Sequence, residues 1–133
     1  MVFTIKQNAT LPILRMELYQ DGRTDYNRYQ QNLVNSVITF SMKDTKTGVY
    51  KVVNKAGTLY QKEPCIVDGT PEYYIGYQFT TRDTDCPGVY QAEFKLTVLD
   101  HNNNLIGQLI TPFGEDLYVH IIDSFIKSDP VYS

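Results

Sequence analysis

The chain has 133 residues, of which 42% are hydrophobic and 20% charged, a composition that suits one domain with a buried core. Its formal net charge is -3 and its acidic and basic residues are interspersed, which argues against a nucleic-acid partner. No stretch approaches the roughly 20 apolar residues of a membrane-spanning helix, and the first residues reach Lys6 without the apolar run of a secretory signal, so we expect a protein made in the cytoplasm with no membrane partner.

Alternation of apolar and polar residues dominates the chain and predicts β-strands, whereas no segment has the period of an amphipathic helix. In chain order, strands are expected at 3–6, 14–18, 38–42, 49–53, 59–61, 75–79, 89–99, 105–109 and 117–121. The clearest is 89–99, where Tyr90, Phe94 and Val98 share one face while polar residues occupy the other. This pattern is typical of a half-buried antiparallel strand.

Turn-forming residues separate these segments, at 21–22, 44–48, 54–57, 68–71, 100–104 and 112–114. Those at 44–48, 54–57 and 100–104 are predicted hairpin turns. Short strands with frequent turns indicate a sandwich or a small barrel. We predict an all-β fold, an immunoglobulin-like antiparallel β-sandwich of about seven to nine strands. The sandwich is expected to cover residues 1–126, with a C-terminal tail at 127–133.

The run from Asp85 to Tyr90 (DCPGVY) favours the sandwich over the barrel. It resembles the acid-Gly-Tyr run before strand F of immunoglobulin-like domains, where the tyrosine hydroxyl bonds back to upstream backbone. We therefore assign structural roles to Asp85, Gly88 and Tyr90. Tyr90 is predicted to be buried, with its hydroxyl bonded to backbone or to the turn at 83–86. Ala92 stands where antibody domains carry a cysteine, so no inter-sheet disulfide is expected.

An ordered set of segments spans nearly the whole chain: 3–6 (FTIK), 10–12 (TLP), 37–42 (VITFSM), 77–79 (YQF), 83–85 (DTD), 87–94 (PGVYQAEF), 111–112 (TP) and 117–121 (LYVHI). Together they resemble the immunoglobulin-like domain at the N-terminus of phage baseplate upper proteins and related phage tail proteins. The resemblance implies a non-enzymatic virion structural protein, a docking or adaptor module in a tail, baseplate or neck. It also implies other virion proteins as partners, in a symmetric homo-oligomeric assembly, with the protein in the host cytoplasm during assembly.

Two segments are predicted contact surfaces for neighbouring subunits. The segment 21–35 is longer and more polar than the short turn expected there, yet it carries tyrosine and arginine, the usual energetic anchors of interfaces. The segment 125–132 follows the last predicted strand and carries apolar anchors. The predicted partner-contact residues are Arg23, Tyr26, Arg28, Tyr29, Phe125, Ile126 and Tyr132.

No enzyme motif is present, since the chain lacks a phosphate-binding glycine loop and a Gly-x-Ser-x-Gly elbow. We therefore expect no catalytic residue, no cofactor and no bound metal. His101 is expected in a solvated hairpin loop, and His120 is expected to face solvent or a partner beside Tyr118. The two cysteines, Cys65 and Cys86, fall in separate predicted loops and are expected to be unbonded to each other.

Two further groups of residues have both a functional and a structural interpretation. Loop carboxylates are the ligands that calcium prefers, but the spacing here fits no EF-hand loop, so solvated acids are expected. These acids are Asp83, Asp85, Asp100, Glu115 and Asp116. Neighbouring tyrosines could stack on sugars or bases, but alternation places Tyr73 and Tyr77 in the core and only Tyr74 outward.

Three other functions stay open from the residues alone. They are a capsid decoration protein, a glycan-binding adhesin domain that uses loop tyrosines, and an accessory domain separated from its enzyme. Glycan arrays would identify the adhesin, and gene neighbourhood would separate a tail protein from a capsid protein.

Overall fold

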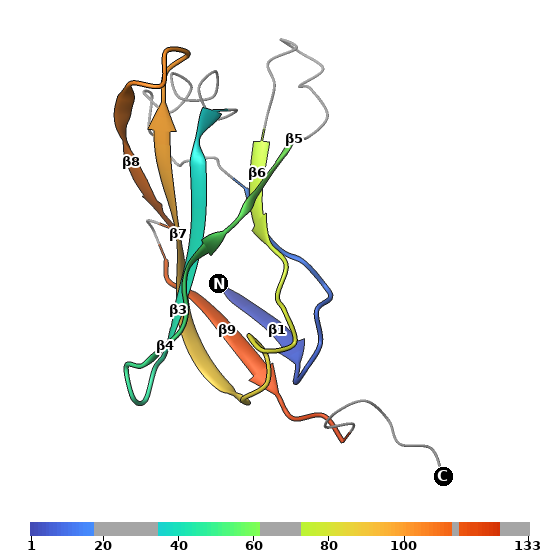
Figure 1. Ribbon diagram of the computed structural model, residues 1–133. Helices are drawn as coiled ribbons and strands as arrows, with labels where there is room; N and C mark the ends of the chain where they lie inside the picture. The colour runs from blue at the N-terminus through green and yellow to red at the C-terminus, as the bar shows by residue number, and fades with distance from the viewer. Residues whose placement is uncertain (18–34, 62–72, 113–114, 126–133) are drawn as a thin grey trace.

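A computed structural model describes residues 1–17, 35–61, 73–112 and 115–125, which form an all-β sandwich (Figure 1). Most of the described residues lie in strands, as the alternation predicts, and the longest described segments outside strands are 7–13 and 78–87. The strands are β1 (Val2–Lys6), β2 (Leu14–Glu17), β3 (Val37–Asp44), β4 (Tyr50–Ala56), β5 (Thr58–Gln61), β6 (Tyr73–Tyr77), β7 (Gly88–Leu99), β8 (Leu105–Thr111) and β9 (Leu117–Ile122). None of the described residues belongs to a helix long and apolar enough to cross a membrane.

The strands form two sheets. The large, six-stranded sheet has the order β1-β9-β7-β3-β4, with β8 also paired to β7, and the small, three-stranded sheet has the order β2-β6-β5. The strand order of the small sheet matches that of strands B, E and D in an immunoglobulin-like sandwich, which face a sheet built on C, F and G. In that scheme β2, β6 and β5 take the places of B, E and D. The all-β sandwich expected from the sequence is therefore observed, except that the strands are not all antiparallel, because β1 and β9 run parallel.

Strand β7 organises the large sheet. It pairs with β3 along one edge, from Gln91 and Tyr90 near its start to Thr97 near its end. Its other edge is shared, because β9 pairs with the first part of β7 and β8 pairs with the second part. Pro112 follows β8 and has no N–H to donate to a ladder, which suits a break between β8 and β9.

The large sheet is mixed rather than purely antiparallel. Strand β1 lies parallel to β9, with Val2 opposite Tyr118 and Lys6 opposite Ile122. The next strand, β2, lies in the small sheet, so the chain leaves the large sheet after β1 instead of returning through a hairpin. At this departure Asn8 has a φ of 66°, a left-handed conformation that asparagine tolerates well.

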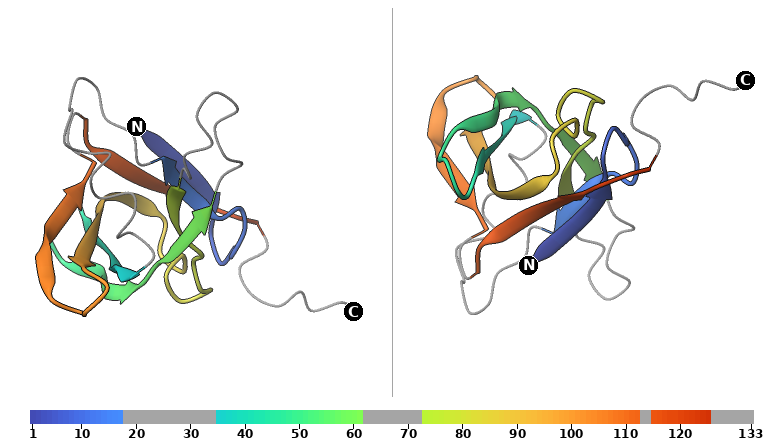
Figure 2. Two further views of the ribbon diagram at one scale, coloured as in Figure 1. Left: turned by 90° about the horizontal axis from the view of Figure 1, so that it is seen from above. Right: turned by 90° about the horizontal axis from the view of Figure 1, so that it is seen from below.

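The hairpin turn expected at 54–57 is wrong. Strand β4 continues to Ala56, and β5 begins at Thr58 in the other sheet, so this segment crosses between the two layers (Figure 2). Gly57 donates its N–H to the Ile38 carbonyl at 2.9 Å. A Cβ atom at Gly57 would lie 2.8 Å from Cγ2 of Ile38. The glycine therefore marks a close backbone approach and not a turn.

The hairpin turns expected at 44–48 and 100–104 are confirmed. In the first, the Asp44 carboxylate accepts hydrogen bonds from two backbone N–H groups of the turn, and Gly48 has a φ of 73°. In the second, the Asp100 carboxylate accepts from two backbone N–H groups, and Asn103 has a φ of 64°. Both are turns closed by an aspartate side chain. The predicted turns at 21–22 and 68–71 lie outside the described residues.

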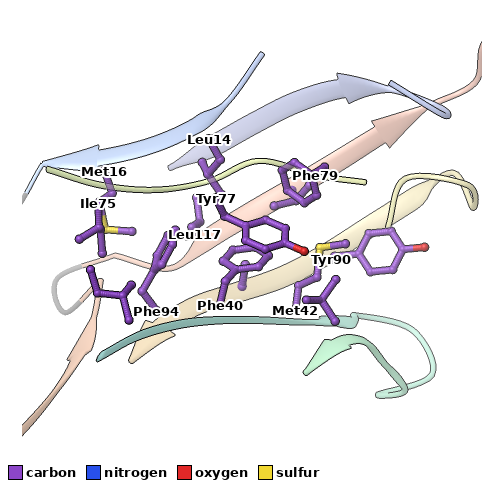
Figure 3. Packing of buried hydrophobic residues seen from close by; sticks show 14 of the residues in the cluster. Leu14, Met16, Phe40, Met42, Ile75, Tyr77, Phe79, Tyr90, Phe94 and Leu117 are labelled. Carbon is purple, nitrogen blue, oxygen red and sulfur yellow. The ribbon is translucent and has the colours of Figure 1, made fainter. Parts of the chain in front are cut away.

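The core lies between the two sheets and is rich in aromatic rings (Figure 3). Phe40 of β3 stacks on Tyr77 of β6, with ring centroids 4.4 Å apart, and contacts Phe94 of β7 at 5.0 Å. Phe79 packs edge-on against Phe40 at 5.7 Å. Each fully buried side chain of this size contributes about 1.5–3 kcal/mol. Such contacts join the two sheets where antibody domains use a disulfide, and Ala92 is buried among them.

Candidate functional site

Phe125 is the predicted partner-contact residue that lies within the described part of the chain. It follows β9, and its exposed fraction is 94%. Phe125 is the last of the described residues, and a single exposed apolar side chain is common on protein surfaces, so its contact role stays a prediction. The other predicted contact residues lie outside the described residues: Arg23, Tyr26, Arg28, Tyr29, Ile126 and Tyr132. Their roles stay predictions.

The predicted tyrosine corner is confirmed. Tyr90 has an exposed fraction of 3%, and its hydroxyl donates a hydrogen bond to the Cys86 carbonyl oxygen at 2.8 Å. Burial raises the pKa of Tyr90 above its ordinary value. Gly88, between these two residues, has a φ of 156°, a conformation that L side chains rarely adopt. The acid-Gly-Tyr run thus folds locally as the sequence predicts.

Asp85 has a partner that sequence reasoning missed. Its carboxylate forms a salt bridge with the ammonium group of Lys51 on β4, and its carbonyl accepts a hydrogen bond from the Gln7 side chain at 2.9 Å. The hydrogen bond to Lys51 lowers the pKa of Asp85, and the same bond raises the pKa of Lys51. Asp85 therefore ties the corner to β4 as well as forming part of a turn.

Cys65 lies outside the described residues. Cys86 carries a free, exposed thiol, which agrees with the prediction that the two cysteines are not bonded to each other. Its sulfur lies 4.0 Å from the Lys51 ammonium nitrogen. The hydrogen bond to Asp85, followed by burial, raises the pKa of the Cys86 thiol. Because the thiolate is the reactive form, this environment does not activate Cys86 as a nucleophile.

Asp83 was expected to be solvated, and this expectation is wrong. The residue has an exposed fraction of 4%, and its carboxylate accepts hydrogen bonds from the Tyr77 hydroxyl at 2.6 Å and the Thr80 N–H at 2.9 Å. Burial and then the hydrogen bond to Asp83 raise the pKa of Tyr77. These bonds satisfy a carboxylate that would otherwise be costly to bury, so Asp83 is a structural residue.

The loop acids do not gather into a calcium site. Asp85 precedes β7 and Asp100 follows it, so the two lie at opposite ends of the longest strand. Glu115 pairs with the N-terminal amine of Met1 at 3.4 Å. Within the described ranges, no group of three or more histidine, cysteine or acidic side chains is placed to hold a metal ion. His101 is exposed in its hairpin, and His120 is half-buried on β9.

The outer face of the small sheet carries an aromatic and cationic cluster. Tyr60 of β5 lies opposite Tyr74 of β6, and their rings stack with centroids 5.0 Å apart and planes 11° apart. The Arg15 guanidinium of β2 lies over both rings, 5.6 Å from the centroid of Tyr60 and 5.4 Å from that of Tyr74. We call these three residues the Tyr60–Tyr74–Arg15 cluster. The expected outward direction of Tyr74 is confirmed, whereas its two partners were not predicted.

These features define a β-sandwich of immunoglobulin-like strand order with exposed aromatic and charged residues on its surface. Comparisons of the chain with family models, with curated proteins and with solved structures find no match. The function must therefore be inferred from the residues of this chain.

Proposed function

We propose that the chain is a non-enzymatic virion structural protein, a docking or adaptor module in a phage tail, baseplate or neck that acts through protein–protein contacts. The virion assignment is supported by the resemblance of segments along the chain to the immunoglobulin-like domain of phage baseplate upper proteins. The observation that carries the proposal is the sandwich itself with Tyr90 in its corner, because this architecture is what that resemblance implies.

The surface of the sandwich is suited to binding other proteins. Strand β4 ends the order of the large sheet, and its outer edge pairs with no other strand among the described residues. Tyr50 and Val53 on this strand, and Val49 just before it, are exposed. An open edge can accept an added strand from a partner, and exposed apolar side chains around it favour such contact.

A fractionation experiment tests the proposal. Particles of a phage that encodes this chain would be purified and separated into heads and tails, and the chain would be quantified in each fraction by mass spectrometry. We expect it in the tail fraction, at a fixed ratio to a major tail protein. Recovery in heads alone would identify a capsid decoration protein. Absence from purified particles would refute the virion assignment.

A further inference from the structure

We infer that two copies of this chain associate through strand β8, with their β8 edges paired antiparallel about a two-fold axis near Gln108. The inference deepens the proposed function, since it rests on protein–protein contact as the role of the chain and names a second copy as one partner. Figure 1 shows β8 at the margin of the large sheet, and among the described residues it pairs with β7 alone. Its other edge is therefore open to an added strand.

The open edge of β8 is regular and bordered by apolar side chains. Its pairing with β7 has no register shift over residues 107–111. Ile110 lies opposite Lys95, on the outer face of the large sheet, and its exposed fraction is 49%. Leu105 and Ile106, at the other end of the strand, are exposed as well. An added strand would cover these side chains, which gains apolar burial besides the new backbone hydrogen bonds.

The open edge of β8 carries no charge, so a second copy meets no repulsion along it. Residues 102–114 contain no lysine, arginine, aspartate or glutamate. In the paired arrangement the β7 strands of the two copies, which carry Lys95, stand three inter-strand spacings apart, about 14 Å. This separation exceeds the screening length of about 8 Å at physiological salt. The net charge of -3 therefore opposes the pairing only weakly.

The other open edge, that of β4, is guarded against a second copy. It carries Lys51 and Lys55, and its pairing with β3 has two register irregularities. Lysines and bulges on an edge strand are the features by which proteins prevent edges from pairing with one another. Over residues 107–111, β8 has neither feature. We therefore assign the contact between copies to β8 and not to β4.

The two-fold axis makes the contact self-complementary. In such a contact the same surface is used by both copies, so the pairing occupies both β8 edges and the assembly closes as a dimer. Antiparallel pairing keeps opposite side chains on one face, which brings Ile106 of one copy towards Ile110 of the other. The Gln108 side chains of the two copies meet near the axis, where each amide can donate to and accept from the other.

Sedimentation velocity and amide hydrogen exchange on the full chain test the inference. We expect a monomer–dimer equilibrium across a micromolar range of concentrations. Hydrogen exchange at high and low concentration should show that added protection in the dimer is concentrated in residues 107–111. Amides of β4 should exchange at the same rate at both concentrations.

Charged substitutions at Gln108 identify the edge that pairs. Gln108→Glu and Gln108→Lys should each raise the dissociation constant of the dimer about fivefold or more, because like charges then meet at the axis. An equimolar mixture of the two variants should regain dimer, since opposite charges then meet. Val53→Glu and Val53→Lys make the same changes on the open edge of β4 and should alter the dissociation constant less than twofold. Amide spectra of each variant verify that it is folded.

Several results would overturn the inference. A chain that stays monomeric throughout the concentration range would exclude the contact. Dimers that both Gln108 variants leave intact, or that the Val53 variants disrupt equally, would place the contact elsewhere. Growth into species larger than a dimer would contradict the closed two-fold pairing. None of these measurements uses particles, so the inference and the virion assignment can fail independently.

Discussion

The hydroxyl of Tyr90 donates a hydrogen bond to the Cys86 carbonyl oxygen at 2.8 Å and closes the turn that leads into β7. Strand β7 pairs with β3, β8 and β9, so the bond stands at the start of the strand that holds the large sheet together. Because the ring is also buried, the corner combines apolar packing with a satisfied polar group.

Replacing Tyr90 with phenylalanine should lower the free energy of unfolding by about 0.5–1.5 kcal/mol, the net contribution of one hydrogen bond, without changing the fold. Urea unfolding followed by circular dichroism measures this loss. Tyr118→Phe is the matched control, because the Tyr118 hydroxyl makes only a long, exposed contact of 3.4 Å with Asp116. Equal losses in the two variants would contradict the role of the corner.

Tyr77 should make the protein less stable in alkaline solution. Burial and the hydrogen bond to Asp83 raise the pKa of Tyr77 in the folded state above the ordinary value of 10.0. Below pH 10 both states keep this proton, so its contribution to stability is fully present. Above that pH the unfolded chain releases a proton that the folded chain retains, so the free energy of unfolding falls as the pH rises.

The variant Tyr77→Phe tests this contribution. At neutral pH it should cost about 1–3 kcal/mol, because a buried carboxylate loses one of its hydrogen-bond donors. Above pH 10, however, its stability should fall less steeply with pH than that of the unmodified protein. Thermal unfolding across this pH range gives both slopes, and identical slopes would show that Tyr77 is not the group responsible.

The reactivity of Cys86 should depend in opposite directions on its two charged neighbours. The hydrogen bond to Asp85 raises the pKa of the thiol, whereas the charge of Lys51 lowers it. Asp85→Asn should therefore speed alkylation of Cys86 by iodoacetamide, roughly two- to tenfold, and Lys51→Met should slow it. Mass spectrometry of the peptide that contains Cys86 separates its rate from that of Cys65. Changes of the same sign in both variants would contradict the arrangement.

Local patterns in the sequence predicted the strands well. Segment 89–99 alternates without interruption, and its apolar positions from Tyr90 to Val98 are all buried. The tyrosine corner was also predictable, because all its members lie within one short run. In each case the residues that interact are close in sequence, so alternation and turn chemistry are enough to place them.

Contacts between distant segments were not predictable in the same way. The partner of Asp85 is Lys51, 34 residues away, and no local pattern joins them. The direction of Tyr74 followed from alternation, but its stacking with Tyr60 and Arg15 requires the register of β2, β6 and β5, which depends on how the chain crosses between layers. Asp83 was misjudged for a different reason: Tyr77 is only 6 residues away, but alternation does not reveal that the turn after β6 folds back so that the Asp83 carboxylate meets the buried Tyr77 hydroxyl.

Gly57 should tolerate no side chain. In Gly57→Ala the new Cβ atom would lie 2.8 Å from Cγ2 of Ile38 and 3.1 Å from the Gly76 carbonyl oxygen, so backbone must move where the chain changes sheets. We expect a loss of about 1–3 kcal/mol in unfolding free energy, as for other overpacked sites. Gly107→Ala is the control, because nothing lies within 4 Å of its added atom. A similar melting temperature for both variants would contradict the close approach of backbone at Gly57.

Phe125 should matter for assembly and not for folding. Its exposed fraction of 94% means that Phe125→Ala removes almost no packing, so the unfolding free energy should change by less than about 0.5 kcal/mol. Leu11→Ala provides the comparison, because Leu11 is another exposed apolar residue, between β1 and β2, with no proposed contact role.

Truncation of an interface anchor often costs about 2 kcal/mol or more of binding energy. In purified virions, quantified by mass spectrometry against a major tail protein, Phe125→Ala should therefore be depleted severalfold relative to Leu11→Ala. The variant Tyr29→Ala, in the other predicted contact segment, should behave in the same way. Normal incorporation of both Phe125→Ala and Tyr29→Ala would remove these two segments as contact surfaces and leave the open edge of β4 as the surface where partners other than a second copy bind.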